Sequence, residues 1–122
     1  MASVLVNLGE ERLVDAISGG ASSLADYIAW GSGVGVSAKP DTSLFTEESE
    51  GRVLGTVSKT GSGASAKYQI VGTITASAPK MITNAGTWTA VSGGVLVFKG
   101  DFTAIVLNTG DAILFTITAD PS

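Results

Sequence analysis

Histidine and cysteine are both absent from this chain of 122 residues, and charged side chains are few, with seven basic and eleven acidic residues. Without cysteine the chain can form neither a disulfide nor a thiolate metal site. Without histidine it lacks the side chain that most often activates a serine or threonine nucleophile. These absences favour a protein that works by binding and assembly, and we expect no enzymatic activity.

Positive charge is scarce and scattered along the chain, and the net charge is −4. Nucleic-acid binding needs concentrated positive charge to displace counterions, so we expect no nucleic-acid partner. No run approaches the roughly 20 apolar residues of a membrane span, and the first six residues show no signal-peptide pattern. We therefore expect no association with a membrane. The absence of cysteine fits synthesis in a reducing cytoplasm, where disulfides are rare.

The charged fraction of 15% lies below the usual quarter, and Ser, Thr, Gly and Ala replace the missing charge. A neutral surface suits burial against partners, because the cores of protein interfaces are depleted in charge. The length is typical of one domain. We expect a single β-sandwich domain over residues 1–122, in which residues 1–50 form a helix-and-loop part and residues from about 52 onward close the β core.

Two segments, residues 68–77 and 111–119, alternate between apolar side chains and Thr, Ser or Gln. This alternation is typical of half-buried antiparallel strands. One face of each strand must leave water. The predicted core residues on these faces are Ile70, Ile74, Ile113, Phe115 and Ile117.

Shorter apolar runs also read as strands, and turn residues separate them. Residues 27–31 and 52–59 are predicted strands, the second with Val53 and Val57 on one face. The predicted turns, rich in glycine, are residues 60–65, 84–86, 92–94, 99–101 and a hairpin turn at 108–111. Many short strands at this spacing predict an all-β fold, an antiparallel β-sandwich or jelly roll.

One short N-terminal helix is expected over residues 8–18. Asn7 can cap its first turn and Glu10 can reach back to the cap. Leu13, Val14 and Ile17 would form its apolar face, and the Gly19-Gly20 pair would end it.

A glycine-rich stretch, residues 31–35, superficially resembles a phosphate-binding loop. Such a loop needs a helix directly after it, and Lys39 and Pro40 follow instead of a helical pattern. We interpret the stretch as a turn.

Four carboxylates gather in an irregular segment, at Asp41, Glu47, Glu48 and Glu50. They could bind calcium, but their spacing matches no known calcium loop. A glycosidase pair is conceivable as well, although nothing in the sequence would raise the pKa of one member. The favoured interpretation is a solvated acidic loop, or one that contacts basic residues of a partner, and we expect no metal and no cofactor.

Two tryptophans are further partner-contact candidates. Trp30 and Trp88 could stack sugars on a lectin-like surface, but aromatic residues at strand positions more often belong to the core. The two interpretations differ in whether the indole rings face solvent.

The order of these segments resembles that of small virion structural proteins of tailed bacteriophages, described as capsid decoration (cement) or tail-fibre-like proteins. The resemblance covers nearly the whole chain. It rests on turns and strands and on no catalytic motif. Its segments are residues 7–12, 27–33, 41–44, 68–75, 82–86 and 107–116, with Glu48, Arg52, Gly93, Gly94 and Phe102 between them. The chain departs from the expected pattern at Thr87-Trp88, where Leu or Phe is expected after the Asn-Ala-Gly turn.

The resemblance implies a role in the virion. The leading expectation is a decoration protein on the capsid surface, assembled as a homotrimer, that binds the major capsid protein and stabilises the shell. The alternative is a tail-fibre or receptor-binding module that recognises a host surface. A third possibility is a small carbohydrate-binding domain with no virion role.

Overall fold

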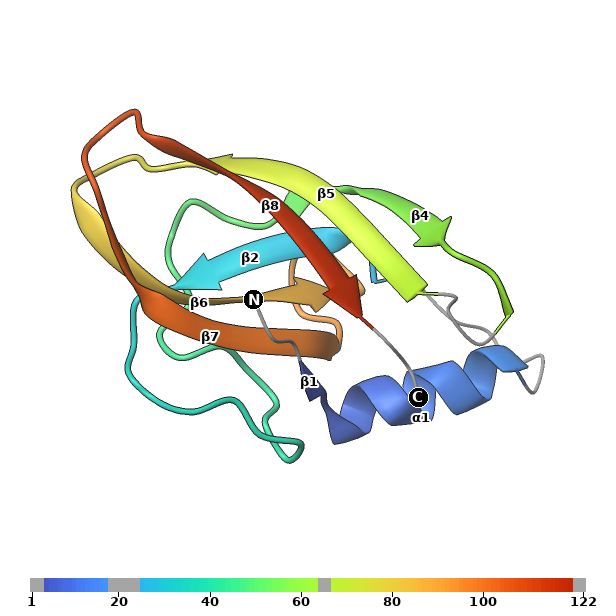
Figure 1. The fold of residues 1–122 in the computed structure, drawn as a ribbon. Helices are drawn as coiled ribbons and strands as arrows, with labels where there is room; N and C mark the ends of the chain where they lie inside the picture. Colours follow the sequence, from blue (N-terminus) through green and yellow to red (C-terminus); the bar gives the residue numbers. More distant parts are fainter. Residues whose placement is uncertain (1–3, 18–24, 64–66, 120–122) are drawn as a thin grey trace.

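The computed structural model describes residues 4–17, 25–63 and 67–119, which form two antiparallel sheets and one helix (Figure 1). This arrangement confirms the predicted all-β sandwich with a short N-terminal helix. In chain order the elements are β1 (Val4–Leu5), α1 (Asn7–Ile17), β2 (Tyr27–Gly31), β3 (Val53–Leu54), β4 (Thr56–Thr60), β5 (Lys67–Thr75), β6 (Lys80–Trp88), β7 (Leu96–Leu107) and β8 (Ala112–Ala119).

One sheet has five strands in the order β1-β7-β6-β2-β3, and the other has three in the order β4-β5-β8. The main core lies between them. The prediction for β5 and β8 is confirmed at Ile70, Ile74, Phe115 and Ile117, which are buried, whereas Ile113 is partly buried. Burying each of these large side chains contributes about 1.5–3 kcal/mol.

The N-terminal part contributes more to the core than the sequence predicts. β2 lies between β6 and β3, and its Ile28 and Trp30 are buried in the main core. The Trp30 ring meets the Phe115 ring edge-on, with centroids 6.2 Å apart. The expectation that residues from about 52 onward close the core is therefore wrong, because a central strand comes from the first 31 residues.

α1 begins one residue earlier than predicted and lies beside the start of β7 (Figure 1). Gly9 allows this close approach, since a Cβ atom at that position would lie 2.4 Å from the carbonyl oxygen of Val97. Val14, predicted on the apolar face, is 62% exposed. The side chains of Leu13 and Ile17, and the Gly19-Gly20 pair, lie outside the described part of the chain.

The predicted turn at residues 84–86 is instead the middle of β6. All three residues are buried, and each pairs with β2 on one side and β7 on the other. A Cβ atom at Gly86 would lie 2.7 Å from the carbonyl oxygen of Phe98 and 2.9 Å from the Leu44 side chain. Small residues are needed here because β6 is closely packed against its neighbours, and the chain does not change direction.

Residues 99–101 were also predicted as a turn, and they lie within β7. The pairing of β6 with β7 shifts between Ile82, opposite Ile105, and Asn84, opposite Asp101. Such a β-bulge bends a strand, and β7 curves strongly (Figure 1).

The single strand predicted over residues 52–59 is wrong, because the segment divides at Gly55 into β3 and β4, which belong to different sheets. The N–H of Gly55 donates to the carbonyl of Asp26 at 2.7 Å. Val53 and Val57 therefore do not share a face. Residues 108–111 do turn, but they lead from β7 in the five-stranded sheet to β8 in the three-stranded sheet. They therefore do not close the hairpin that the sequence suggested. The turn at 92–94 and the β4–β5 hairpin are as predicted.

Candidate functional site

The four candidate carboxylates lie in the loop of residues 32–52 that joins β2 to β3. Its backbone folds back along the end of β2. The N–H of Gly33 donates to the carbonyl of Phe45 at 2.8 Å, and the N–H of Glu48 donates to the carbonyl of Trp30 at 3.0 Å. The loop therefore places its carboxylates against the five-stranded sheet.

Glu50 is the most enclosed of the carboxylates, with a side chain 6% exposed. It accepts hydrogen bonds from the indole N–H of Trp30 at 3.0 Å and from the N–H and hydroxyl of Ser77 at 2.9 and 3.0 Å, and it pairs with Lys80. Burial acts to raise the pKa of Glu50. The hydrogen bonds from Lys80, Ser77 and Trp30 outweigh it and hold the pKa at about 2.

Lys80, at the start of β6, also reaches Glu48, with Nζ 3.1 Å from Oε1. The hydroxyl of Ser32 donates to the other oxygen of Glu48 at 2.9 Å. Burial opposes the charge on Lys80, but the two carboxylates raise its pKa above the ordinary value. We call this group the Lys80 cluster; its members are Trp30, Ser32, Glu48, Glu50, Ser77 and Lys80.

A second buried lysine holds the earlier part of the loop. Lys99 of β7 is 1% exposed, and its Nζ lies 2.9 Å from Oδ2 of Asp41 and 3.2 Å from the centre of the Phe45 ring. The Lys99 ammonium and the N–H of Ala38 lower the pKa of Asp41. Asn84 of β6 adds two hydrogen bonds of 3.1 Å to the backbone of Phe45. The tip of the loop is thus tied to β6 and β7.

Arg52 closes the far end of the loop. Its guanidinium pairs with Glu47, with Nε 3.1 Å and Nη2 3.3 Å from the two carboxylate oxygens. It also donates to the carbonyls of Ala90 and Gly93, and its Cζ lies 3.6 Å above the ring of Trp88. Trp88 itself is 6% exposed.

The structure therefore pairs each of the four carboxylates with a cation of the same chain: Lys99, Arg52 and Lys80. Sequence reasoning missed these cations, which come from strands and from the loop end. Contact between these carboxylates and a partner stays a prediction. Glu47 and Glu48 keep part of their side chains exposed for it, 27% and 20% respectively.

Both tryptophans agree with the core interpretation. Trp30 lies between the sheets, and Trp88 is buried beneath Arg52. A sugar could stack on Trp88 only after Arg52 moved away. The geometry therefore does not favour a lectin-like surface at these two residues.

No group of three or more His, Cys, Asp or Glu among the described residues could hold a metal ion. In the same part of the chain, no helix has the length and apolar character needed to cross a membrane.

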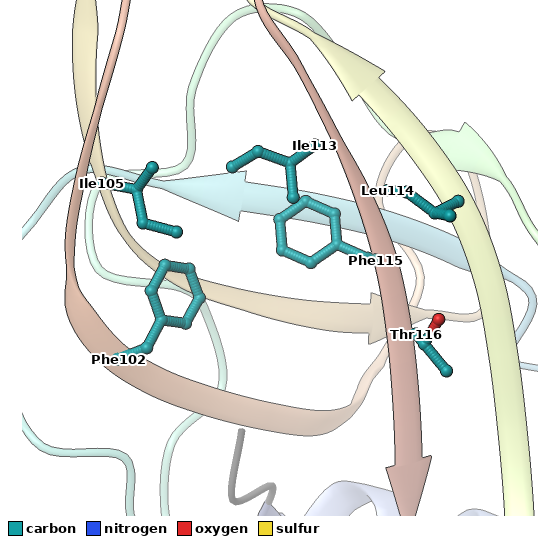
Figure 2. A pocket seen from close by; sticks show the side chains of 6 residues that line it. All are labelled: Phe102, Ile105, Ile113, Leu114, Phe115 and Thr116. Atoms are coloured by element: carbon teal, nitrogen blue, oxygen red, sulfur yellow. The ribbon is translucent and has the colours of Figure 1, made fainter.

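The other notable feature is an apolar opening between β7 and β8, with a volume of about 230 Å³. Figure 2 shows the rings of Phe102 and Phe115 pointing into it from the two strands, with their centroids 6.5 Å apart. The opening is lined by Phe102, Ile105, Ile113, Leu114, Phe115 and Thr116. Sequence reasoning did not predict it, although both strands carry the signal: residues 102–110 and 112–119 contain no charge.

Comparisons of the chain with models of protein families, with curated proteins and with solved structures find no match. In the described part of the chain, the fold is an antiparallel β-sandwich with a charged loop held by ion pairs and an apolar opening between β7 and β8.

Proposed function

We propose that this chain is a bacteriophage capsid decoration protein that binds the assembled major capsid shell as a homotrimer and stabilises it. The observation that carries the proposal is the apolar opening between β7 and β8. An exposed apolar surface is typical of a site that another protein covers. The resemblance of the segment order to small virion proteins supports the choice of partner.

The loop of residues 32–52, which ion pairs within the chain hold in place, gives the proposal further support. Residues 32–52 are irregular, and ordering such a segment costs conformational entropy. The Lys80 cluster, the Asp41–Lys99 pair and the Glu47–Arg52 pair offset this cost before any partner binds. A loop fixed in advance loses little entropy on binding, which favours a contact surface.

Stabilisation would follow from mass action. A protein that binds the assembled shell and not the loose subunits shifts the equilibrium toward the shell. A homotrimer that contacts several capsid subunits at once would also gain from avidity.

The test is the abundance of the chain in virus particles purified from the cells that produce it. Quantitative mass spectrometry would give the ratio of this chain to the major capsid protein, and cryo-electron microscopy would show its place. A ratio near that of the capsid protein, with density on the shell, is the expected result. A few copies at the tail would identify the tail-fibre alternative, and absence from particles would refute both.

A further inference from the structure

The loop between β2 and β3 contains a strained backbone position. Thr46 has a φ of 52°, and among the described residues no other residue except glycine has a positive φ. A β-branched side chain crowds its own backbone in this region, so the conformation persists only where the surrounding structure enforces it. Strain of this kind is concentrated at functional sites and in segments that switch between two conformations.

Contacts on both sides of Thr46 enforce the strain. Before it, the side-chain amide of Asn84 bonds both the N–H and the carbonyl of Phe45, each at 3.1 Å. After it, Glu47 forms a β-bridge with Gly31 at the end of β2. Thr46 therefore has to turn the chain between two positions that the five-stranded sheet fixes.

Charge fixes both ends of the surrounding segment, residues 41–48, which we call the strap. At its start Asp41 lies 2.9 Å from Nζ of Lys99, and at its end Glu48 lies 3.1 Å from Nζ of Lys80. Both lysines belong to the five-stranded sheet, on β7 and β6. The two ends therefore hold the strap against this sheet.

The apolar anchorage of the strap is small and lies outside the main core. Every strap residue is described, and Leu44 is the only one of them with a buried apolar side chain. It belongs to the smaller cluster with Ala29, Trp88 and Leu96, and no strap residue belongs to the main core between the sheets. The strap can therefore separate from the sheet while the main core stays packed.

The strands beneath the strap carry glycines where it touches them. A Cβ atom at Gly31 of β2 would lie 2.4 Å from the carbonyl oxygen of Phe45, and one at Gly86 of β6 would lie 2.9 Å from the side chain of Leu44. The strap thus covers the backbone of β2 and β6 directly. Separation would uncover this part of the sheet and would expose Leu44 and Phe45 as well.

We propose that the strap is a lid that opens as one unit while the sandwich stays folded, and that the strain at Thr46 favours its opening. In the open form Thr46 returns to an ordinary backbone conformation. Asp41 and Lys99 both reach water, so neither charge is left buried without a partner. The ion pairs and Asn84 keep the closed form dominant. The inference concerns the free chain and does not depend on the proposed function.

Residue-resolved hydrogen exchange, measured by NMR on the full chain, tests the proposal. Four amides report on the strap, because each donates a hydrogen bond that opening would break: those of Ser32, Gly33, Phe45 and Glu48. Opening as one unit should give the four amides a common protection factor. This factor should be about tenfold or more below that of the best protected amides of the β5–β8 ladder, which exchange only when the core unfolds.

The chain offers a matched pair of variants. Thr46→Asn should raise the protection of the four amides about fivefold or more, because asparagine tolerates the left-handed conformation and relieves the strain of the closed form. Thr42→Asn makes the same replacement at an exposed strap residue whose φ is not positive, and it should leave the protection unchanged. Thr46→Gly is the second variant and should act in the same direction as Thr46→Asn.

Three results would overturn the proposal. Protection of the four amides equal to that of the β5–β8 ladder would mean that the strap opens only when the whole chain unfolds. Four unrelated protection factors would exclude opening as one unit. An equal effect of Thr46→Asn and Thr42→Asn would exclude Thr46 as the source of the strain. Each of these results would leave the proposed function untouched.

Discussion

Replacement of Glu50 by glutamine tests how strongly the Lys80 cluster holds the loop. The variant removes the charge that pairs with Lys80 but keeps a side-chain oxygen for Trp30 or Ser77. A fall in the pKa of Glu50 from its ordinary 4.5 to about 2 corresponds to about 3 kcal/mol of stability, because each pH unit is worth about 1.4 kcal/mol. Since Lys80 retains Glu48, we expect Glu50→Gln to lose about 2–3 kcal/mol at neutral pH.

The pH dependence gives the same test a second measurement. The pKa of Glu50 is lower in the folded chain than in the unfolded chain, so its contribution to stability is present above pH 4.5 and is lost as the pH falls toward 2. The wild type should therefore lose stability in this window more steeply than Glu50→Gln. Asp41 and Asp101, whose pKa values are also lowered, are unchanged in the variant, so the difference in slope isolates Glu50.

Urea unfolding, followed by tryptophan fluorescence from neutral pH to pH 3, would provide both quantities. The control is Glu11→Gln, which removes an exposed carboxylate on α1 and should change stability by less than about 0.5 kcal/mol. A loss at Glu50→Gln no larger than that of the control, or an unchanged pH slope, would refute the reasoning.

Three further predictions concern the core, the helix and metal ions. Phe115→Ala should cost about 3–5 kcal/mol in the free energy of unfolding, through lost burial and the cavity left beside Trp30; a cost below about 1 kcal/mol would place the ring outside the core. Gly9→Ala should destabilise the chain by about 1–3 kcal/mol, because the added Cβ would meet the carbonyl of Val97, and thermal unfolding that matches the wild type would contradict this packing. A metal chelator should leave the melting temperature unchanged, since the loop carboxylates already pair with cations of the chain, and a marked fall would revive the calcium interpretation.

Local patterns in the sequence predicted the features that depend on neighbouring residues. The alternation in β5 and β8 identified the buried faces of Ile70 and Ile117, which lie opposite each other in the sheet. The strand at residues 27–31 matches β2 residue for residue. β5 and β8 follow from periodicity, and β2 follows from a short run of aromatic and apolar residues; a single chain displays both signals directly.

The features that the sequence did not predict depend on contacts between distant residues. Asn84 and Gly86 looked like turn residues, yet they lie where a strand is crowded from both sides. Lys99 looked like a turn cation, and it is buried because Asp41, which precedes it by 58 residues, supplies the opposite charge. The candidate carboxylates were found from their clustering, but their partners lie on other elements and leave no local pattern.

The central position of β2 determines the order in which the chain can fold. β2 emerges from the ribosome early, but its longest pairing is with β6, which begins at Lys80. β1 is without its partner strand for longer still, because it pairs with β7, which is synthesised after β6. At a synthesis rate of about 5–20 residues per second, β2 is left without β6 for several seconds. Assembly of the five-stranded sheet is therefore delayed until most of the chain has been made, and folding of this non-local topology is expected to be slow compared with that of a helical domain of the same size.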